Sequence, residues 1–327
     1  DDVPDLSHVE AAGRAVGEHV RPGTLVVLES TSYPGTTQEV LVPLLLEASG
    51  LGAHELDVAF SPERIDPGNR TYGLRNTPKV VGADTERALE RAAAFYETFV
   101  ERVMPVSSAA TAEMAKLLEN TFRHINIALA NEMAILCRAL GLDVWEVIDA
   151  AATKPFGFMP FYPGAGVGGH CIPIDPMYLS WKVRQHGGAA RFIALAREVN
   201  AGMPAYVVGR VQELLNDVGK AVRGSSVVMM GVTYKPNVAD LRESPALEVI
   251  AGLRRLGAEV SYCDPFVPSL AVGGVEVAHA TDPATADCVV IVTAHRHVDH
   301  DAVARTARLV LDTCNATRVD GTVVHRL

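Results

Sequence analysis

The feature that most constrains the fold is a long helical stretch in the middle of the chain. Residues 109–141 read AATAEMAKLLENTFRHINIALANEMAILCRALG. Apolar residues lie almost all round this stretch, which predicts a helix buried on several sides. About 30 residues at 1.5 Å each make it about 45 Å long. Gly141 is suited to end it, because glycine readily adopts the left-handed conformation of a helix C-cap. The chain is therefore built around one long helical connector.

Strands alternate with helices on both sides of this connector. Before it, GTLVVLEST (23–31), ELDVAF (55–60) and KVVGA (79–83) are predicted strands, and TTQEVLVPLLLEAS (36–49) is a predicted helix. The same alternation resumes after it, with SSVVMMGVTY, AEVSYCDP, DCVVIVTAH and ARLVLDT as strands. Alternating strands and helices are typical of doubly wound α/β layers. We predict an α/β protein with a nucleotide-type domain over residues 1–105, a helical connector over 106–204 and a second such domain over 205–327.

The composition is that of an ordinary globular protein and argues against several functions. Of the 327 residues, 48% are hydrophobic and 21% charged, as in average globular domains. The net charge of −10 and the lack of a Lys/Arg run argue against nucleic-acid binding. No apolar stretch approaches the ~18 residues of a membrane span, and the acidic start DDVPDLSHVE has no signal-peptide pattern. Five widely spaced cysteines without C-x-x-C favour a reducing cytoplasm, without disulfides or a metal site.

A glycine-rich loop carries the first candidate site. GAGVGGHCIPIDP (164–176) contains G-x-G-x-x-G, but no strand precedes it and its prolines are expected to exclude a helix after Gly169. A dinucleotide site needs both, so we interpret the match as a coincidence. What remains is a tight loop that exposes Cys171, with Asp175 four residues later to orient a water or a base. Cys171 is either a nucleophile in a rigid, partly open place or an ordinary small buried residue.

The long helix carries the second candidate site. Glu113, Lys116, Asn120 and Arg123 recur at three- and four-residue steps and form one polar stripe. The stripe is either a solvated face or a set of partly buried groups. In the second case Lys116 and Asn120 could act as general base or oxyanion donors.

Three loops after predicted strands carry the third set of candidates. GVTYKPNVADLRESPALEVI (231–250) places Lys235 and Arg242 where α/β sheets bind ligands, and these cations suit phosphates or a carboxylate. The alternative is a simple surface loop. LESTSYPGTT places Ser30 and Thr31 past one strand, and FSPERIDPGN places Glu63 past the next.

Together these segments resemble the UDP-glucose/GDP-mannose dehydrogenase family over nearly the whole chain. GGHCIPIDP is similar to its catalytic-cysteine motif, KLLENTF to its lysine–asparagine helix, FSPERIDPG to its glutamate loop and GVTYKPNVADLRESP to the start of its UDP-sugar domain. The sequence around Cys171 is most similar to the UDP-N-acetylglucosamine 6-dehydrogenase branch of the family.

The resemblance implies two Rossmann-like domains and a two-step oxidation of a sugar C6 alcohol to a carboxylate with two NAD+. Cys171 would form a thiohemiacetal and then a thioester, Lys116 and Asn120 would stabilise oxyanions, and Asp175, Glu63 and Thr31 would manage the hydrolytic water. Further implied contacts are with the UDP-sugar (Phe161, Tyr162, Gly164, Gly166, Gly168, Arg64, Lys235) and with NAD (Ser30, Thr31, Arg242). A homodimer through the long helix is implied as well.

One departure from the family pattern concerns the first domain. Family members begin with a strand and a G-x-G-x-x-G loop that cradles NAD, and this sequence starts later in that domain, so we expect the first domain to be incomplete at its N-terminus. One alternative is a non-catalytic UDP-sugar-binding fragment. The other is a short-substrate 3-hydroxyacid dehydrogenase, which fits the sequence less well because its reaction does not require a cysteine such as Cys171. The sugar itself stays open among N-acetylglucosamine, N-acetylmannosamine, N-acetylgalactosamine and glucose, because the residues that contact C2 and C4, where these sugars differ, are not identified.

Overall fold

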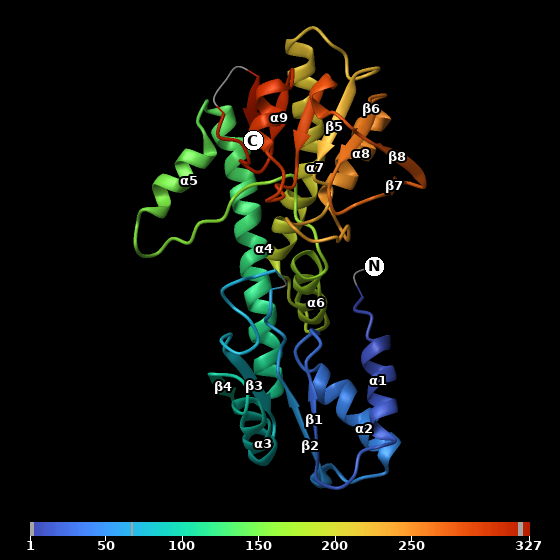
Figure 1. The fold of residues 1–327 in the computed structure, drawn as a ribbon. Coiled ribbons are helices and arrows are strands. Elements are labelled where there is room, and N and C mark those ends of the chain that lie inside the picture. Colours follow the sequence, from blue (N-terminus) through green and yellow to red (C-terminus); the bar gives the residue numbers. More distant parts are fainter. Residues whose placement is uncertain (1–2, 67, 320–322) are drawn as a thin grey trace. The chain divides into compact units, whose positions relative to one another are not determined.

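The fold is taken from a computed structural model, which describes residues 3–66, 68–319 and 323–327. By its internal contacts the chain divides into two compact units. Unit 1 comprises the residues up to Phe122 together with Ile174–Arg191, and unit 2 comprises Arg123–Pro173 and Phe192–Leu327. Each unit has its own sheet and its own core. The α/β class with two nucleotide-type domains and a central helix is confirmed (Figure 1).

Unit 1 is built on a four-stranded sheet in the order β1-β2-β3-β4. The strands are β1 (Thr24–Leu28), β2 (Leu56–Phe60), β3 (Lys79–Ala83) and β4 (Val103–Val106). β1 pairs parallel with β2, and β3 pairs parallel with β4, but β3 runs antiparallel to β2. Between β2 and β3 the described residues, 61–66 and 68–78, contain no helix of the kind that joins parallel strands.

Helices cover both faces of this sheet. They are α1 (Ser7–Gly17), the π-helical turn Thr37–Leu41 with α2 (Val42–Ser49), a short 3₁₀ turn (Ala53–Glu55) and α3 (Glu86–Glu97). Successive side chains of a strand point to opposite faces. Val26 and Val58 therefore pack with α2 residues, whereas Val27 and Ala59 pack with α3 residues. β1 and β2 are therefore apolar on both faces, as expected for strands of a sheet that is covered by helices on both sides.

Unit 2 contains a seven-stranded sheet in the order β11-β10-β9-β5-β6-β8-β7. Its strands are β5 (Ser226–Met230), β6 (Glu259–Cys263), β7 (Leu270–Val272), β8 (Val275–His279), β9 (Cys288–Ile291), β10 (Val310–Asp312) and β11 (Val324–Arg326). Only the β7–β8 pair is antiparallel among the described pairs. The order runs outward in both directions from β5 and β9, which is the doubly wound arrangement with its switch point between these two strands.

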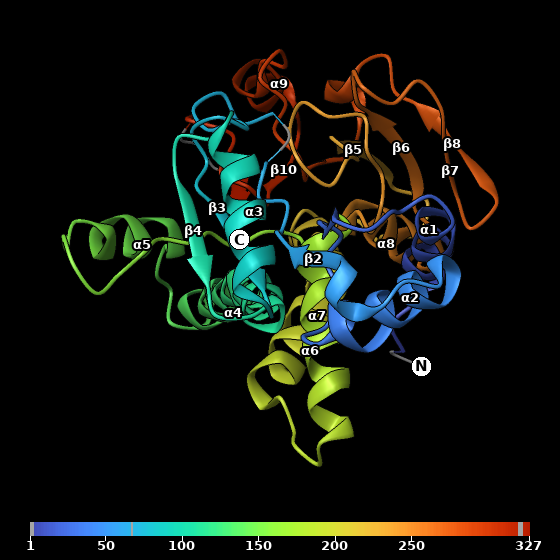
Figure 2. The same ribbon diagram turned by 90° about the horizontal axis from the view of Figure 1, so that it is seen from below.

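The helices of unit 2 pack on both faces of that sheet. α7 (Arg191–Asp217) and α8 (Pro245–Arg255) cover one face through Val227 and Met229, and α9 (His300–Thr306) covers the other through Val228 and Met230. Figure 2 shows α8 and α9 on opposite sides of the strands. A 3₁₀ turn (Pro283–Thr285) precedes β9. Ser244 and Pro245 occupy the N-cap and first turn of α8, as predicted.

Two helices contribute more than one residue to each of the two units. α4 (Ala109–Ala139) has 31 residues, which confirms the long helix expected from the sequence. Gly141 follows it at φ +72°. α5 (Val144–Ala152) begins after Asp143, whose side chain accepts a hydrogen bond from the Trp145 N–H.

The other, α6 (Cys171–Gln185), corrects the expectation that prolines exclude a helix after Gly169. Pro173 lies in the first turn, where backbone N–H groups have no intrahelical partner to lose. Pro176 lies inside the helix and is tolerated there. The stretch before Gly164 still contains no strand, so the G-x-G-x-x-G match remains without the strand that a dinucleotide loop needs.

Candidate active site

Cys171 is the first residue of α6 and the one exposed cysteine among the five. A helix N-terminus favours the anionic thiolate, because the helix dipole is positive there. Cys137 and Cys288 are buried and Cys263 and Cys314 are half-buried. Burial raises the pKa of the Cys288 thiol to about 12, so that side chain stays a neutral thiol. Exposure and helix position therefore distinguish Cys171 from the other four cysteines, and its role as a nucleophile stays a prediction.

The loop that leads to Cys171 is fixed by close backbone contact with another loop of unit 2. The Gly169 N–H donates to the Arg242 carbonyl at 3.0 Å. A Cβ on Gly168 would lie 2.6 Å from the Glu243 carbonyl oxygen, and a Cβ on Gly169, at φ +83°, would lie 2.8 Å from the Tyr234 ring. Only glycine fits at both positions. These glycines therefore serve close packing of two loops.

The beginning of the same loop is anchored to two helices. The Gly164 N–H donates to Asn131 Oδ1 of α4 at 2.9 Å. Asn131 Nδ2 in turn donates to Asn200 Oδ1 of α7 at 2.9 Å, and both side chains are buried. Fixed at each end, residues 164–169 form a rigid segment ahead of the thiol.

Five of the residues predicted to contact the UDP-sugar lie in or just before this segment, between Phe161 and Gly168, and their local contacts differ. Tyr162 stacks on Trp145 of α5, with ring centroids 5.6 Å apart, and its hydroxyl donates to Asp149. Gly166 adopts φ +138° against Pro245. Phe161 and Gly168 are half-buried. UDP binding by these residues stays a prediction.

Lys235 and Arg242 lie on the loop that follows β5, at the carboxyl end of that strand. Lys235 is half-buried, and its ammonium lies 6.0 Å from the centre of the Tyr234 ring. Arg242 is exposed and pairs with Asp240 at 2.7 Å. That pairing raises the pKa of Arg242, with a smaller contribution from the charge of Cys171. A phosphate at Arg242 would therefore compete with the Asp240 carboxylate.

In unit 1, the polar stripe of α4 faces inward over its first three members. Glu113 and Asn120 are buried and Lys116 is half-buried, whereas Arg123, at the start of unit 2, is exposed. Asn120 Nδ2 donates to Asp175 Oδ2 of α6 at 2.5 Å, and Asp175 is buried too. The solvated-face alternative is therefore wrong for Glu113, Lys116 and Asn120.

Glu113 has a role that sequence reading missed. It accepts hydrogen bonds from the Gly35 N–H at 2.5 Å, the Thr37 N–H at 2.9 Å and the Thr37 hydroxyl at 2.7 Å. Burial raises the pKa of Glu113, although these donors offset part of the effect. The segment that Glu113 holds follows Ser30 and Thr31, so α4 fixes the loop at the carboxyl end of β1. The only feature of the sequence that pointed to Glu113 was its three-residue spacing from Lys116.

Glu63 and Arg64 lie in the loop after β2. The Glu63 carboxylate accepts from the N–H groups of Arg64 and Ile65 at 2.7 and 2.6 Å. The buried Lys79, at the start of antiparallel β3, lies 3.5 Å from it. Arg64 pairs with Glu119 of α4 at 2.8 Å and donates to the Pro78 carbonyl at 2.6 Å. The loop is thus held from both sides, and substrate binding by Arg64 remains a prediction.

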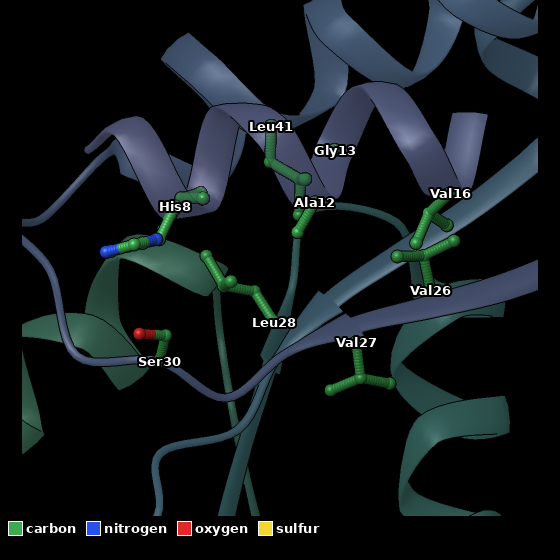
Figure 3. Close-up of a pocket in the computed structure, with 10 residues that line it drawn as sticks. His8, Ala12, Gly13, Val16, Val26, Val27, Leu28, Ser30 and Leu41 are labelled. Atoms are coloured by element: carbon green, nitrogen blue, oxygen red, sulfur yellow. The ribbon is translucent and has the colours of Figure 1, made fainter. Parts of the chain in front are cut away.

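Ser30 and Thr31 lie past the carboxyl end of β1, as expected. Ser30 lines a hollow of about 210 Å³ between α1 and β1, together with His8 and mainly apolar side chains (Figure 3). Parallel strands bind cofactors outside their carboxyl ends. Cofactor binding by Ser30 and Thr31 stays a prediction.

Comparison with known proteins decides the family. The UDP-glucose/GDP-mannose dehydrogenase family matches over residues 1–100 as its NAD-binding domain, 110–202 as its central domain and 228–319 as its UDP-binding domain. The chain belongs to this family. It is thus an oxidoreductase of the nucleotide-sugar dehydrogenase class with NAD as cofactor, which confirms the resemblance seen in the sequence.

Individual relatives agree with this assignment. An NDP-N-acetyl-D-galactosaminuronic acid dehydrogenase of Ralstonia solanacearum is 38% identical over 96% of this chain and 75% of its own length. A UDP-N-acetyl-D-glucosamine 6-dehydrogenase of Pseudomonas aeruginosa is 39% identical over 81% of this chain and 63% of its own. The structure of a UDP-D-ManNAc dehydrogenase from Pyrococcus horikoshii superposes with a TM-score of 0.89 at 34% identity, over 99% of this chain and 77% of that one.

Over residues 3–66, 68–319 and 323–327, no helix is long and apolar enough to cross a membrane.

Proposed function

We propose that the protein oxidises the C6 hydroxyl of a UDP-sugar to a carboxylate through a thioester on Cys171, with UDP-N-acetylglucosamine as the substrate. The observation that carries the proposal is Cys171 itself, exposed at the start of α6 behind a loop fixed by Gly168 and Gly169. Relatives named for N-acetylated UDP-sugars support the substrate class. UDP-N-acetylmannosamine and UDP-glucose are the alternative sugars.

In this proposal each group has a separate role. Cys171 is the nucleophile, the Lys235 cation meets the sugar end, and the 161–168 segment holds the uridine diphosphate. Lys116 and Asn120 stabilise oxyanions, and the hydroxyls of Ser30 and Thr31 would hold NAD. NAD+, when bound, accepts one hydride from the substrate in each of the two oxidations. Residues 1–105, 106–204 and 205–327 would be the cofactor, connector and UDP-sugar parts.

The chemistry of the chain's own residues follows from their charge. The Cys171 thiolate adds to the aldehyde carbon, and the carbonyl oxygen becomes an oxyanion that the Lys116 cation and the Asn120 amide stabilise. Loss of hydride from this thiohemiacetal leaves a thioester. Water then attacks the thioester carbonyl, its proton passes to a carboxylate such as Asp175 or Glu63, and the thiolate leaves. The hydrogen bond between Asn120 and Asp175 keeps both groups on α4 and α6 in fixed orientation.

We further propose that the protein is a cytoplasmic homodimer assembled through α4. Leu118, Leu129 and Leu136 of α4 are 60%, 54% and 49% exposed. Their spacings of eleven and seven residues bring them to one side of a 3.6-residue helix. An apolar stripe of this kind favours a second copy of the same helix as its partner.

The test of the catalytic proposal compares the reactive thiol with a half-buried one. Cys171→Ala should abolish formation of the uronic acid while UDP-sugar binding, measured by calorimetry, stays within about threefold. Cys263→Ala is the matched control and should keep full activity. Acid formation by Cys171→Ala at the normal rate would overturn the thioester route. Calorimetry with UDP-N-acetylglucosamine, UDP-N-acetylmannosamine and UDP-glucose identifies the sugar, and binding without turnover would indicate a binding fragment.

A further inference from the structure

A buried Asp–His pair lies at the switch point of the unit 2 sheet. Asp264 follows β6 and His295 follows β9, and His295 Nε2 lies 2.9 Å from Asp264 Oδ2. Their side chains are 0% and 1% exposed. Burial by itself raises the pKa of Asp264. Hydrogen bonds from His295, Val232 and Phe266 outweigh it and hold the pKa below the usual range, so Asp264 is an anion.

The hydrogen bonds around His295 determine which ring nitrogen carries the proton. The Asn237 N–H donates to His295 Nδ1 at 3.0 Å, so Nδ1 must be an acceptor. Nε2 therefore carries the hydrogen and donates to Asp264. The imidazole is thus a neutral bridge with one defined tautomer, and Asp264 fixes its orientation.

This bridge shapes the loop over residues 231–244, which we call the β5 loop. Asn237 adopts a left-handed φ of +64°, which asparagine tolerates better than most residues. Its backbone N–H is held by His295, and its Oδ1 accepts from the Arg296 N–H at 3.0 Å. Asp264 Oδ2 accepts from the Val232 N–H at 2.7 Å at the start of the loop. The pair therefore fixes both the beginning and the middle of the β5 loop.

The other end of the β5 loop receives the segment ahead of Cys171. The Tyr234 N–H donates to the Asp240 carbonyl at 3.1 Å and closes the loop. The Arg242 carbonyl then accepts from the Gly169 N–H, and Glu243, at φ +51°, presents the carbonyl against which Gly168 packs. A change in loop conformation would remove the surface on which these glycines dock.

We propose that His295, oriented by Asp264, is a positioning residue that holds the β5 loop in the conformation required by the Cys171 segment and by Lys235. It touches neither thiol nor sugar and acts through the loop. The inference rests on the proposed function in taking Cys171 and Lys235 as the groups that meet the UDP-sugar.

The experiment compares His295→Ala with His297→Ala, which alters an exposed histidine two residues away. The readouts are the affinity for UDP-N-acetylglucosamine by calorimetry, the alkylation rate of Cys171 by iodoacetamide and the melting temperature. We expect His295→Ala to weaken binding at least tenfold. We also expect alkylation to slow at least threefold, because the loop that carries Arg242, whose charge interacts with that of Cys171, no longer holds its position. Added imidazole should restore part of both, whereas His297→Ala should resemble the unchanged protein.

A folded His295→Ala protein with unchanged affinity and unchanged alkylation would overturn the proposal, as would the same losses in His297→Ala. If His295→Ala does not fold, His295→Gln replaces it, because the glutamine amide can still donate to Asp264 but offers no acceptor at the Nδ1 position for the Asn237 N–H. It should show both losses in smaller measure, and normal values would contradict the proposal. If the unchanged protein binds no UDP-sugar, the proposed substrate is wrong, and the alkylation rates still decide the role of His295.

Discussion

Glu113 and His124 show, on one helix, how burial acts on two titratable side chains with different partners. Glu113 is buried and accepts three hydrogen bonds from the loop after β1. His124 is equally buried, but neither of its ring nitrogens has a hydrogen-bond partner within the described part of the chain. A buried polar group without a partner costs stability, and a buried charge costs more. The first residue therefore anchors a loop, and the second makes the fold sensitive to acid.

The stability of the protein should fall as the pH drops below about 6.5. Burial, with a smaller effect of Arg197, lowers the pKa of His124, so the unfolded chain takes up a proton before the folded one does. The contribution of His124 to the free energy of unfolding is therefore fully present above the pKa that His124 has in the unfolded chain. It declines as the pH falls toward the pKa of His124 in the folded protein, by at most about 1.4 kcal/mol per pH unit for each such group. His124→Leu should reduce the loss of melting temperature between pH 7.5 and 5.5. An equal loss in His124→Leu and in the exposed control His186→Gln would contradict this.

At the scale of elements, two glycines should respond oppositely to the same substitution. A Cβ on Gly82 of β3 would lie 2.1 Å from the Ser108 carbonyl, whereas a Cβ on Gly209 of α7 meets nothing within 4 Å. Gly82→Ala should lower the free energy of unfolding by about 3 kcal/mol or more, because β3 and the start of α4 must separate. Gly209→Ala should raise it by about 0.5–1 kcal/mol, since alanine is the better helix former. Urea unfolding of both variants measures this, and a stable Gly82→Ala protein would show that the contact can relax.

The edge of β1 is a second feature at this scale. Among the described strands, β1 pairs only with β2, and apolar hollows flank both of its faces, one lined by Val16 and the other by Phe95. An exposed apolar edge strand promotes association with other chains. Val16→Lys combined with Phe95→Lys should lower light scattering at high protein concentration. Val218→Lys, at an exposed apolar residue of unit 2, should not lower it, and equal scattering in both variants would exclude this edge as the cause.

At the scale of the whole molecule, the proposed dimer depends on the exposed leucines of α4. Leu129→Glu should convert a dimer into monomers in size-exclusion chromatography with light scattering, because a carboxylate would be buried without a partner. Val275→Glu, which changes an equally exposed valine on β8, should leave the dimer intact. A single mass corresponding to one chain for the unchanged protein would contradict the dimer itself.

Much of the architecture could be predicted, because local sequence patterns indicate where its helices and strands begin and end. The apolar run of α4, the strands before Ser30 and Glu63 and the helix start at Ser244 all follow from periodicity and capping. The residue types of the candidate site, a thiol in a glycine loop and a lysine with an asparagine on a helix, were also readable. The helix that begins at Cys171 was not, because prolines in a first turn look like helix breakers unless the turn is known to start there.

The alternation of strands and helices follows from the sequence alone, as do the family motifs and the chemical groups available for catalysis, since these depend on neighbours along the chain. Which groups meet depends on tertiary packing. Glu113 reaches the loop after β1, Asn120 bonds Asp175, and His295 bonds Asp264 only because distant segments end at the same edge of a sheet or on facing helices. Such contacts cannot be predicted from the spacing of residues along the chain. They form when apolar strands and helices pack together and their ends come into register.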